Sequence, residues 1–346
     1  MRLVTGKRQS RSTYPMSSNI LVTGGSGFIG SSFIRYGLKE IASLQQIVNL
    51  DLLTYAANTD NLLEVAHDER YTFVKGDIAD QALVEKLCIE HQIDTIVHFA
   101  AETHVDRSIA TPHLFYETNV GGTIALLDVI KRHPHIHFHH ISTDEVFGSL
   151  SKEGKFSEIS PYQPNSPYSA SKAASDHFVR AYAHTYNLST SISHCSNNYG
   201  PFQYVEKFIP RMIAGCLHKK PLPVYGTGEN VRDWIFVDDH SKAVWMILKK
   251  KQPGLSYTIG GDCERKNIDL LHTIIDHFSL LKNESSDSYR KLITFTPDRK
   301  GHDLRYAVDS RKIQSEIGWS ASHDFSSGIV KTITWYLKHP ERLQLL

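Results

Sequence analysis

Residues 19–30, Asn-Ile-Leu-Val-Thr-Gly-Gly-Ser-Gly-Phe-Ile-Gly, decide the fold of this chain. The first five residues have the apolar pattern of a short buried strand, and the glycine pattern Gly24-x-x-Gly27-x-x-Gly30 follows at once and opens a helical segment. Glycines permit a tight turn and let backbone N–H groups approach a pyrophosphate at the helix N-terminus. The stretch predicts a strand, turn and helix that bind a dinucleotide; the alternative is a glycine-rich turn without a ligand.

Asp51 supports the dinucleotide over the ligand-free turn. It closes the next apolar segment, residues 47–51, about twenty residues after the glycines, where a carboxylate binds the adenosine ribose diol. Its negative charge would repel the 2′-phosphate of NADP, so we expect NAD. Asp77 and Ile78, after the third strand, are placed to meet the adenine.

Strands alternate with helices on both sides of this unit. The further strand patterns cover residues 47–51, 71–74, 95–100, 138–142 and 191–194, and helical patterns lie at residues 80–91 and 113–132. Such alternation predicts an α/β protein built on a doubly wound parallel Rossmann sheet.

The alternation of strand and helix patterns weakens after residue 198, where proline and glycine become frequent and indicate loops. We expect residues 19–198 to form the NAD-binding Rossmann domain, with a return segment near residues 233–260. Residues 199–232 and 261–346 should form a smaller mixed α/β lobe that binds the substrate, because ligands of such folds bind at the carboxyl ends of the strands. Residues 1–18 are expected to be a disordered tail, and they lack the apolar core of a secretory signal.

The composition excludes several classes of partner. The formal net charge of the 346 residues is +1, so no basic field favours nucleic acid or a membrane surface. The apolar runs are strand-sized, which predicts no membrane-spanning helix. The 4 cysteines have no CxxC spacing, so we expect reduced thiols, no disulfide framework, no metal site and a cytoplasmic location.

Three side chains indicate redox chemistry at a carbinol. Tyr168 and Lys172 lie four residues apart and share one face of a helix, and Thr143 ends the strand that precedes them. A free tyrosine has a pKa of about 10, and a lysine ammonium together with a nicotinamide cation should lower it. We therefore predict that Tyr168 accepts a hydroxyl proton while hydride leaves the same carbon, and that Thr143 hydrogen-bonds the oxygen.

The acid pair Asp144-Glu145 directly follows this threonine. Once the hydroxyl carbon is a ketone, the neighbouring C–H is acidified, so a base can remove it while an acid expels the β-hydroxyl as water. We assign the base to Glu145 and the acid to Asp144, because a carboxyl whose pKa is raised by a neighbouring charge can stay protonated. The alternative is a helix N-cap with two solvated acids.

Seven strings carry a resemblance to a known family: DLLTYAAN at residues 51–58, HFAAETHVDRS at 98–108, STDEV at 142–146, SPYSASK at 166–172, CSNNYGP at 195–201, RDW at 232–234 and DRKGHD at 298–303. From about residue 19 to 336 the chain resembles the extended short-chain dehydrogenase/reductase family, and within it the sugar-nucleotide 4,6-dehydratases. The resemblance implies an intramolecular redox dehydration of a nucleotide-activated glucose to its 4-keto-6-deoxy form, with NAD regenerated in each turnover. It points to dTDP-glucose as the substrate, in deoxysugar biosynthesis such as that of rhamnose, although the residues themselves do not fix the base.

The resemblance also assigns positions to the site. Around NAD it places Gly24, Gly27, Phe28, Ile29, Gly30, Asp51, Leu52, Leu53, Thr54, Asp77, Ile78, Phe99, Ala100, Ala101, Thr118, Tyr168, Lys172 and Asn198. Around the sugar nucleotide it places Thr103, Thr143, Asn197, Lys207, Phe208, Pro223, Val224, Tyr225, Arg232, Asn267, Asp298, Arg299 and His302. Arg232 suits the diphosphate, because guanidinium groups grip phosphate oxygens bidentately; its alternative is a surface arginine.

Three positions depart from the family pattern: Phe147 replaces a typical Tyr, Thr103 a typical Ser and Lys300 a typical Pro. None removes a catalytic group. Related 4-epimerases keep the Thr or Ser and the Tyr–Lys pair but lack the Asp-Glu pair, and related decarboxylases keep the Glu but usually not the Asp. A non-catalytic NAD-binding scaffold is the third alternative, and the presence of Tyr168 and Lys172 disfavours it.

Two further features have competing interpretations. His133, His135, His137, His139 and His140 precede or enter the fifth strand, and we expect an exposed strand approach rather than a metal site. The helical stretches 113–132 and 168–186 are where the family forms homodimers, so we expect a homodimer, although core packing alone would explain their apolar stripes.

Overall fold

The computed structural model describes residues 18–344. The tail predicted as disordered therefore lies, apart from Ser18, outside the described residues. None of the helices between residues 18 and 344 combines the length and the apolar character that crossing a bilayer requires.

The larger sheet is built from the strands β1 (Asn19–Thr23), β2 (Gln46–Asp51), β3 (Tyr71–Lys75), β4 (Thr95–His98), β5 (His137–Thr143), β6 (Thr190–Cys195) and β10 (Leu255–Ile259). Within the described residues these 7 strands run in the order β10-β6-β5-β4-β1-β2-β3, and every pairing is parallel. The predicted doubly wound parallel sheet is confirmed. β4 ends at His98 rather than at Ala100, because the chain turns there into the loop that lines the site.

Helices cover both faces of this sheet. They are α1 (Phe28–Glu40), α2 (Gln81–Glu90), α5 (Gly122–Arg132), α6 (Pro167–Tyr186), α8 (Val237–Lys250) and α11 (Arg311–Ile317). Along β1, Leu21 packs with α2, α5 and α6, whereas Ile20 and Val22 pack with α1 and α8. Successive side chains of a strand point to opposite faces, so an apolar strand such as β1 requires a helical layer on each side.

The segment predicted as one helix over 113–132 is interrupted. It consists of α4 (Pro112–Phe115), a π-helical turn η2 (Tyr116–Gly121) and α5. Single π turns occur inside α-helices, often at functional sites. Here η2 carries Thr118 to the cavity described below.

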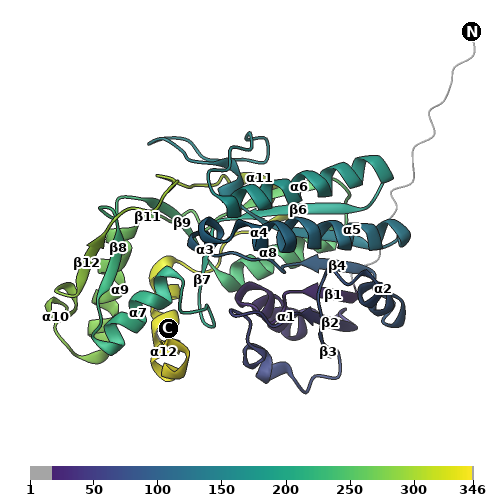
Figure 1. Ribbon diagram of the computed structural model, residues 1–346. Helices are drawn as coiled ribbons and strands as arrows, with labels where there is room; N and C mark the ends of the chain where they lie inside the picture. Colours follow the sequence, from purple (N-terminus) through teal and green to yellow (C-terminus); the bar gives the residue numbers. More distant parts are fainter. Residues whose placement is uncertain (1–17, 345–346) are drawn as a thin grey trace, which may run out of the picture.

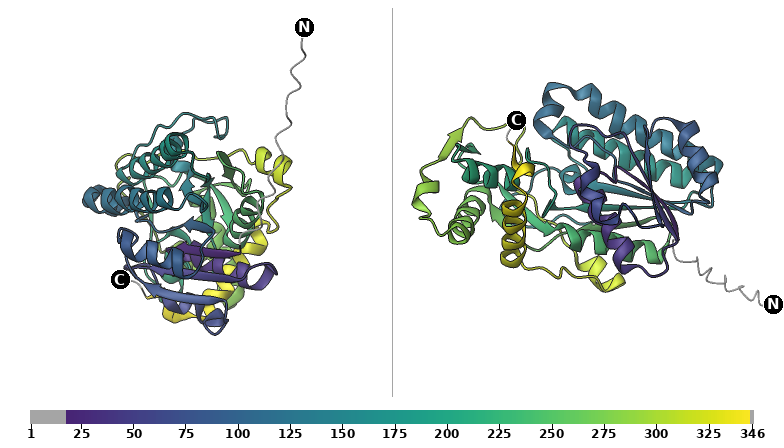
Figure 2. Two further views of the ribbon diagram at one scale, coloured as in Figure 1. Left: turned by 90° about the vertical axis from the view of Figure 1, so that its right-hand side faces the viewer. Right: turned by 90° about the horizontal axis from the view of Figure 1, so that it is seen from below.

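The smaller lobe lies at the carboxyl ends of the large sheet (Figure 1). Its strands are β7 (Asn197–Tyr199), β8 (Leu222–Tyr225), β9 (Val231–Phe236), β11 (Glu264–Lys266) and β12 (Ile293–Thr296), and its helices are α7 (Phe208–His218), α9 (Asn267–Lys282), α10 (Asp287–Arg290) and α12 (Phe325–Lys338). β11-β9-β7 form a mixed sheet and β12-β8 a parallel pair. The lobe has a core of its own, in which α7, α9 and α12 pack together. The right-hand view of Figure 2 shows this lobe set apart from the larger sheet.

The remaining elements are short: η1 (Thr59–Val65), α3 (Val105–Ala110), η3 (Asp144–Phe147) and η4 (Pro340–Leu343). α8 and β10 lie within the segment 233–260 and return the chain to the large sheet beside β6. The exact division of the chain into two domains stays a prediction.

Candidate active site

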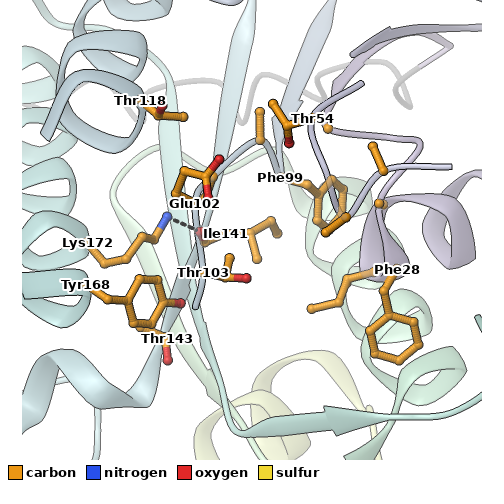
Figure 3. Close-up of a pocket in the computed structure, with 18 of the residues that line it drawn as sticks. Phe28, Thr54, Phe99, Glu102, Thr103, Thr118, Ile141, Thr143, Tyr168 and Lys172 are labelled. Carbon is orange, nitrogen blue, oxygen red and sulfur yellow. Dashed lines mark hydrogen bonds between the residues drawn. The ribbon is translucent and has the colours of Figure 1, made fainter. Parts of the chain in front are cut away.

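A cavity of about 530 Å³ opens at the carboxyl ends of the large sheet. Its walls come from the turn after β1, the ends of β2, β4 and β5, helix α6 and the segment between β6 and β7. In Figure 3, Phe28, Thr54 and Phe99 lie on one side of this space, and Thr143, Tyr168 and Lys172 lie on the other. This is the edge where the sequence predicted ligands to bind.

Most of the predicted cofactor residues line this cavity. They are Gly24, Gly27, Phe28, Ile29, Gly30, Asp51, Leu52, Thr54, Asp77, Ile78, Phe99, Ala100, Ala101, Thr118, Tyr168, Lys172 and Asn198. Leu53 is not part of the lining; its backbone N–H donates to Asp51 Oδ1 at 2.8 Å, and its φ of 59° turns the chain beside the carboxylate.

The predicted substrate residues divide into two groups. Thr103, Thr143, Asn197 and Lys207 line the cavity together with Asp144 and Glu145. The others lie outside its lining, in the smaller lobe: Phe208, Pro223, Val224, Tyr225, Arg232, Asn267, Asp298, Arg299 and His302.

The glycine turn has the geometry that close approach of a pyrophosphate needs. Gly24 has a φ of +72°, and a Cβ there would lie 2.5 Å from Ala100 N; a Cβ on Gly30 would lie 2.4 Å from Gly24 O. Gly27, the first residue before α1, would meet only Gly24 O, at 3.3 Å. Gly24 and Gly30 are therefore required by packing, whereas Gly27 leaves the helix N-terminus open to a ligand.

Asp51 is fixed at the end of β2. Its carboxylate is buried and accepts hydrogen bonds from Ser26 N at 2.9 Å and Leu53 N at 2.8 Å. Burial raises the pKa of Asp51, and the two backbone bonds oppose that rise. Together with the open glycine turn, this carboxylate fits the pyrophosphate and ribose of a dinucleotide.

Tyr168 and Lys172 project from the start of α6, which Ser166 caps with a capping box. Lys172 Nζ donates to the backbone carbonyl of Ile141 at 2.8 Å, as Figure 3 shows. Burial lowers the Lys172 pKa to about 8.

Without a cofactor, Tyr168 does not have the lowered pKa that the sequence predicts for the complex with NAD. Burial, followed by the charge of Glu145, raises this pKa well above its usual value, and a hydrogen bond with Thr143 opposes the rise only in part. The chain alone therefore keeps Tyr168 a neutral phenol. Positive charge that arrives with the bound cofactor has to lower this pKa before Tyr168 acts as a base.

The acid pair sits in η3, where Thr143 Oγ1 accepts from Glu145 N at 3.3 Å and donates to Asp144 Oδ1 at 3.3 Å. Asp144 is 1 % exposed, and burial followed by the charge of Glu145 raises its pKa well above the usual value. Both observations disfavour the interpretation of two solvated acids.

Glu145 differs from Asp144 in its charged neighbours. Burial raises its pKa too, but three cations oppose the rise: Arg232, Lys207 and Arg299. Two carboxyls whose surroundings separate their pKa values can act as a protonated acid and an ionised base. The geometry thus supports the predicted roles of the pair.

Arg232 is buried and its guanidinium faces backbone. It donates to the carbonyls of Val231 at 2.7 Å and Asp303 at 3.0 Å, and it stacks over the Tyr306 ring at 4.2 Å. It is therefore no surface arginine, and in this arrangement it acts on Glu145 through its charge.

Two of the remaining small-lobe residues, Arg299 and Tyr225, meet α3 of the large lobe. Arg299 Nε lies 2.7 Å from Asp106 Oδ1, and the Tyr225 hydroxyl donates to Asp106 Oδ2 at 3.2 Å. His302 Nδ1 lies 2.6 Å from Asp298 Oδ1. Asp106 thus joins the two lobes beside the cavity.

Several lining residues were missed by the prediction: Ala56, Ala57, Gly76, Ala79, Glu102, Leu114, Glu117, Ser142, Cys195, Ser196, Gln203, Tyr204 and Glu206. Glu102 is 5 % exposed, and its pKa is raised, first by burial. Its place next to Thr103 in the 98–108 string was the available signal. The sequence contains no such signal for Gln203, Tyr204 and Glu206, because only the folded chain brings the β7–α7 loop to the cavity.

Three of the five histidines are not exposed, contrary to the expectation, whereas His135 is exposed and His133 half-buried. His137, His139 and His140 are buried in β5. His137 and His139 share Ser191 as a partner, at 2.9 and 2.8 Å, in the neighbouring strand β6. Their role in the sheet is a hydrogen-bonded ladder, and no group of three or more metal-ligating side chains occurs between residues 18 and 344.

The comparisons with known proteins agree with this geometry. The sequence model of the GDP-mannose 4,6 dehydratase family matches residues 21–332. A probable dTDP-glucose 4,6-dehydratase of Sinorhizobium fredii is 48% identical over 332 residues, which cover 92% of this chain and 93% of that protein.

Two solved structures are also similar. The dTDP-glucose 4,6-dehydratase of Streptomyces venezuelae, crystallised with NAD, has a TM-score of 0.88 at 42% identity and covers 94% of this chain and 99% of its own. The dTDP-glucose 4,6-dehydratase of Bacillus anthracis in complex with NAD has a TM-score of 0.85 at 42% identity, with 95% and 100% coverage.

Proposed function

The chain belongs to the nucleotide-sugar dehydratase family that the GDP-mannose 4,6 dehydratase model describes, and we propose that it is an NAD-dependent dTDP-glucose 4,6-dehydratase. It is a hydro-lyase that converts dTDP-glucose to dTDP-4-keto-6-deoxyglucose and serves deoxysugar biosynthesis. The observation that carries the proposal is the pair Asp144 and Glu145, held beside Thr143 and Tyr168 at one cavity, with more cations around Glu145 than around Asp144.

NAD fits the open glycine turn and the Asp51 carboxylate, and when bound it accepts hydride from sugar C4 and returns it to C6. During oxidation, Tyr168 takes the proton of the C4 hydroxyl, and the Thr143 hydroxyl orients the same oxygen. Lys172, anchored at the Ile141 carbonyl, supplies positive charge on the same helix face.

Elimination is divided between the two acids. Glu145 removes the C5 proton, which the C4 ketone has acidified, while Asp144 protonates the C6 hydroxyl so that it leaves as water. The burial of Asp144 keeps its proton available, and the cations around Glu145 favour its carboxylate. A 4-epimerase has no use for this pair, because its reaction removes no water.

The preference for dTDP over other nucleotides rests on the relatives, which are dTDP-glucose 4,6-dehydratases. The test is a panel of dTDP-, UDP-, CDP- and GDP-glucose and GDP-mannose, with product identification by mass and NMR. We expect a 4-keto-6-deoxy product from dTDP-glucose at the highest kcat/KM. A 4-keto-6-deoxy product from GDP-mannose alone would overturn the substrate, and clear NAD binding without any product would favour a scaffold.

The assembly and the location are further proposals. We propose a cytoplasmic homodimer that pairs α4, η2 and α6 of each subunit. Large apolar side chains on η2 and α6 are exposed: Tyr116 by 63% and Phe178 by 38%. Because α6 packs against both α4 and η2, these side chains belong to one region of the surface.

A further inference from the structure

A buried cluster of one carboxylate and two imidazoles lies directly behind the active-site lysine. The side chains of Asp176, His140 and His194 are 0% exposed. Asp176 Oδ2 accepts from Ser142 Oγ at 2.9 Å and the Tyr162 hydroxyl at 2.9 Å, and it lies 3.0 Å from His194 Nε2. Nothing in the proposed reaction uses this cluster, yet a buried carboxylate is costly unless it is paired.

His140 connects the cluster to Lys172. Its Nε2 lies 3.3 Å from Lys172 Nζ and 3.3 Å from Asp176 Oδ1. Lys172 and Asp176 are four residues apart on α6, so they occupy one face, and the imidazole of β5 stands between their charges. Because both approaches involve the same nitrogen, a neutral His140 can hydrogen-bond only one of the two groups at a time, and Asp176 acts on Lys172 through its charge.

The charge states of the three groups follow from their surroundings. Burial alone would raise the pKa of Asp176, but the bonds from His140 and His194 hold it well below its usual range. Burial, followed by the charge of Lys172, lowers the His140 pKa to about 4. Near neutral pH, Asp176 is therefore an anion and His140 a neutral imidazole.

Other groups face Lys172 from the adjoining strands. His98 on β4 is neutral because burial lowers its pKa, and Cys195 on β6 is neutral because burial raises its pKa to about 12. Tyr168, one turn before Lys172, is held neutral too, and the charge of Glu145 in η3 acts on that tyrosine. Asp176 is the carboxylate that raises the Lys172 pKa against the effect of burial.

We propose that Asp176, acting through its charge across the buried His140, is a positioning residue for the oxidation step that keeps Lys172 cationic and fixed at the Ile141 carbonyl. The proposal rests on the proposed function, because it needs a reaction in which Tyr168 loses its proton beside a positive charge. Asp176 does not line the cavity, so it acts on the lysine and not on the substrate.

The test compares Asp176→Asn with the native protein in kcat and KM for dTDP-glucose between about pH 6 and 9.5, a range that spans the pKa of a lysine near 8. We expect the alkaline limb of kcat to move down by about one pH unit or more, because an opposite charge within a few ångströms shifts a pKa by that amount. KM should stay at the native value. Tyr162→Phe is the matched control, because it removes one hydrogen-bond donor to Asp176 and leaves the negative charge of Asp176 in place. The alkaline limb of kcat in this variant should stay at the native pH.

A lower kcat at every pH with an unmoved limb would show a merely structural cluster and overturn the proposal. If Asp176→Asn does not fold, Asp176→Ser takes its place, and the same downward shift is expected because the negative charge is again removed. An unmoved limb in a folded Asp176→Ser variant would equally overturn the proposal.

A second readout does not depend on activity, and it separates failure of this proposal from failure of the proposed function. A lysine with a folded pKa of about 8 and an unfolded pKa of about 10.4 adds to the free energy of unfolding a contribution that rises with pH between these values, because the unfolded lysine binds more protons there. The buried cysteines contribute the opposite slope in both proteins, so the contribution of Lys172 is obtained from the difference between the variant and the native protein. In Asp176→Asn this rise should begin at a lower pH than in the native protein. If both proteins begin to rise at the same pH, the proposal is wrong, whatever the substrate panel shows.

Discussion

At the scale of single residues, two neighbouring carboxyls receive different environments from the same short turn. Asp144 is buried in the cavity wall, where burial and the charge of Glu145 favour its protonated form. Glu145 shares the cavity with Lys207, and the cations that oppose the rise of its pKa favour the carboxylate. The division into acid and base is thus a property of what each side chain faces.

Replacing Glu145 with Gln removes the base but leaves the oxidation residues in place. We expect oxidation at C4 to proceed and elimination to stall, so that reduced cofactor accumulates after dTDP-glucose is added. Near-ultraviolet absorbance of the reduced nicotinamide measures this. The double variant Tyr168→Phe with Glu145→Gln is the control and should show no such absorbance; product release by Glu145→Gln at the native rate would show that the base is another residue.

Replacing Asp144 with Asn removes the acid and keeps the side-chain volume. We expect kcat to fall by about 10²–10⁴, the usual contribution of general acid–base catalysis, with little change in KM. Steady-state measurement of the keto product decides the matter. A native kcat in this variant would mean that another group protonates the C6 hydroxyl.

At the scale of elements, the turn between β1 and α1 contains two kinds of glycine. Gly24 and Gly30 are required by packing, whereas Gly27 leaves room for a ligand at the helix N-terminus. Gly24→Ala should destabilise the protein by more than about 1 kcal/mol, because an alanine strains the left-handed backbone and its Cβ would meet Ala100. Gly27→Ala should fold normally and lose NAD affinity, because its Cβ points toward the open helix N-terminus. Thermal unfolding and NAD titration of both variants test this; equal losses of stability would contradict it.

The strands and helices of the large sheet could be predicted because their signal is local. Apolar runs of strand length and glycines at a fixed spacing specify β1 and α1 within a few residues. The π turn η2 could not be predicted, because helical periodicity is nearly the same with or without one extra residue in a turn. The small mixed sheet could not be predicted from the sequence either, because β7 and β11 are each 3 residues long and have no periodic apolar pattern.

The site was predictable to the extent that motifs and family resemblance named its residues. Thr143, Asp144, Glu145, Tyr168 and Lys172 were assigned from their spacing and do line one cavity. The cluster of Asp176 and His194 behind Lys172 was not found, because its members come from α6 and β6 and meet only through the register of the sheet.

At the scale of the whole molecule, two lobes flank the cavity and touch through the Asp106 contacts with Arg299 and Tyr225. The helices α4, α5 and α6 lie along the far side of the large sheet from the α1–α8 layer (Figure 1). The proposed dimer face, with Tyr116 on η2 and Phe178 on α6, belongs to this layer.

The homodimer proposal predicts that one charge on this face dissociates the protein. Phe178→Asp should shift the mass in solution from dimer to monomer, because a buried unpaired carboxylate opposes association. Light scattering after size exclusion measures the mass. Phe295→Asp is the control, since Phe295 is 61% exposed on β12 in the other lobe and should leave the dimer intact. A native mass for both variants would place the interface elsewhere.

The central claim is that one active site oxidises C4, removes water across C5 and C6 and returns the same hydride to C6. The most direct measurement supplies dTDP-glucose deuterated at C4 and locates the deuterium in the product by NMR and mass spectrometry. The account predicts a product lighter by one water, with the deuterium at C6 and no net consumption of added NAD. A product of unchanged mass with deuterium still at C4 would contradict it and indicate an epimerase.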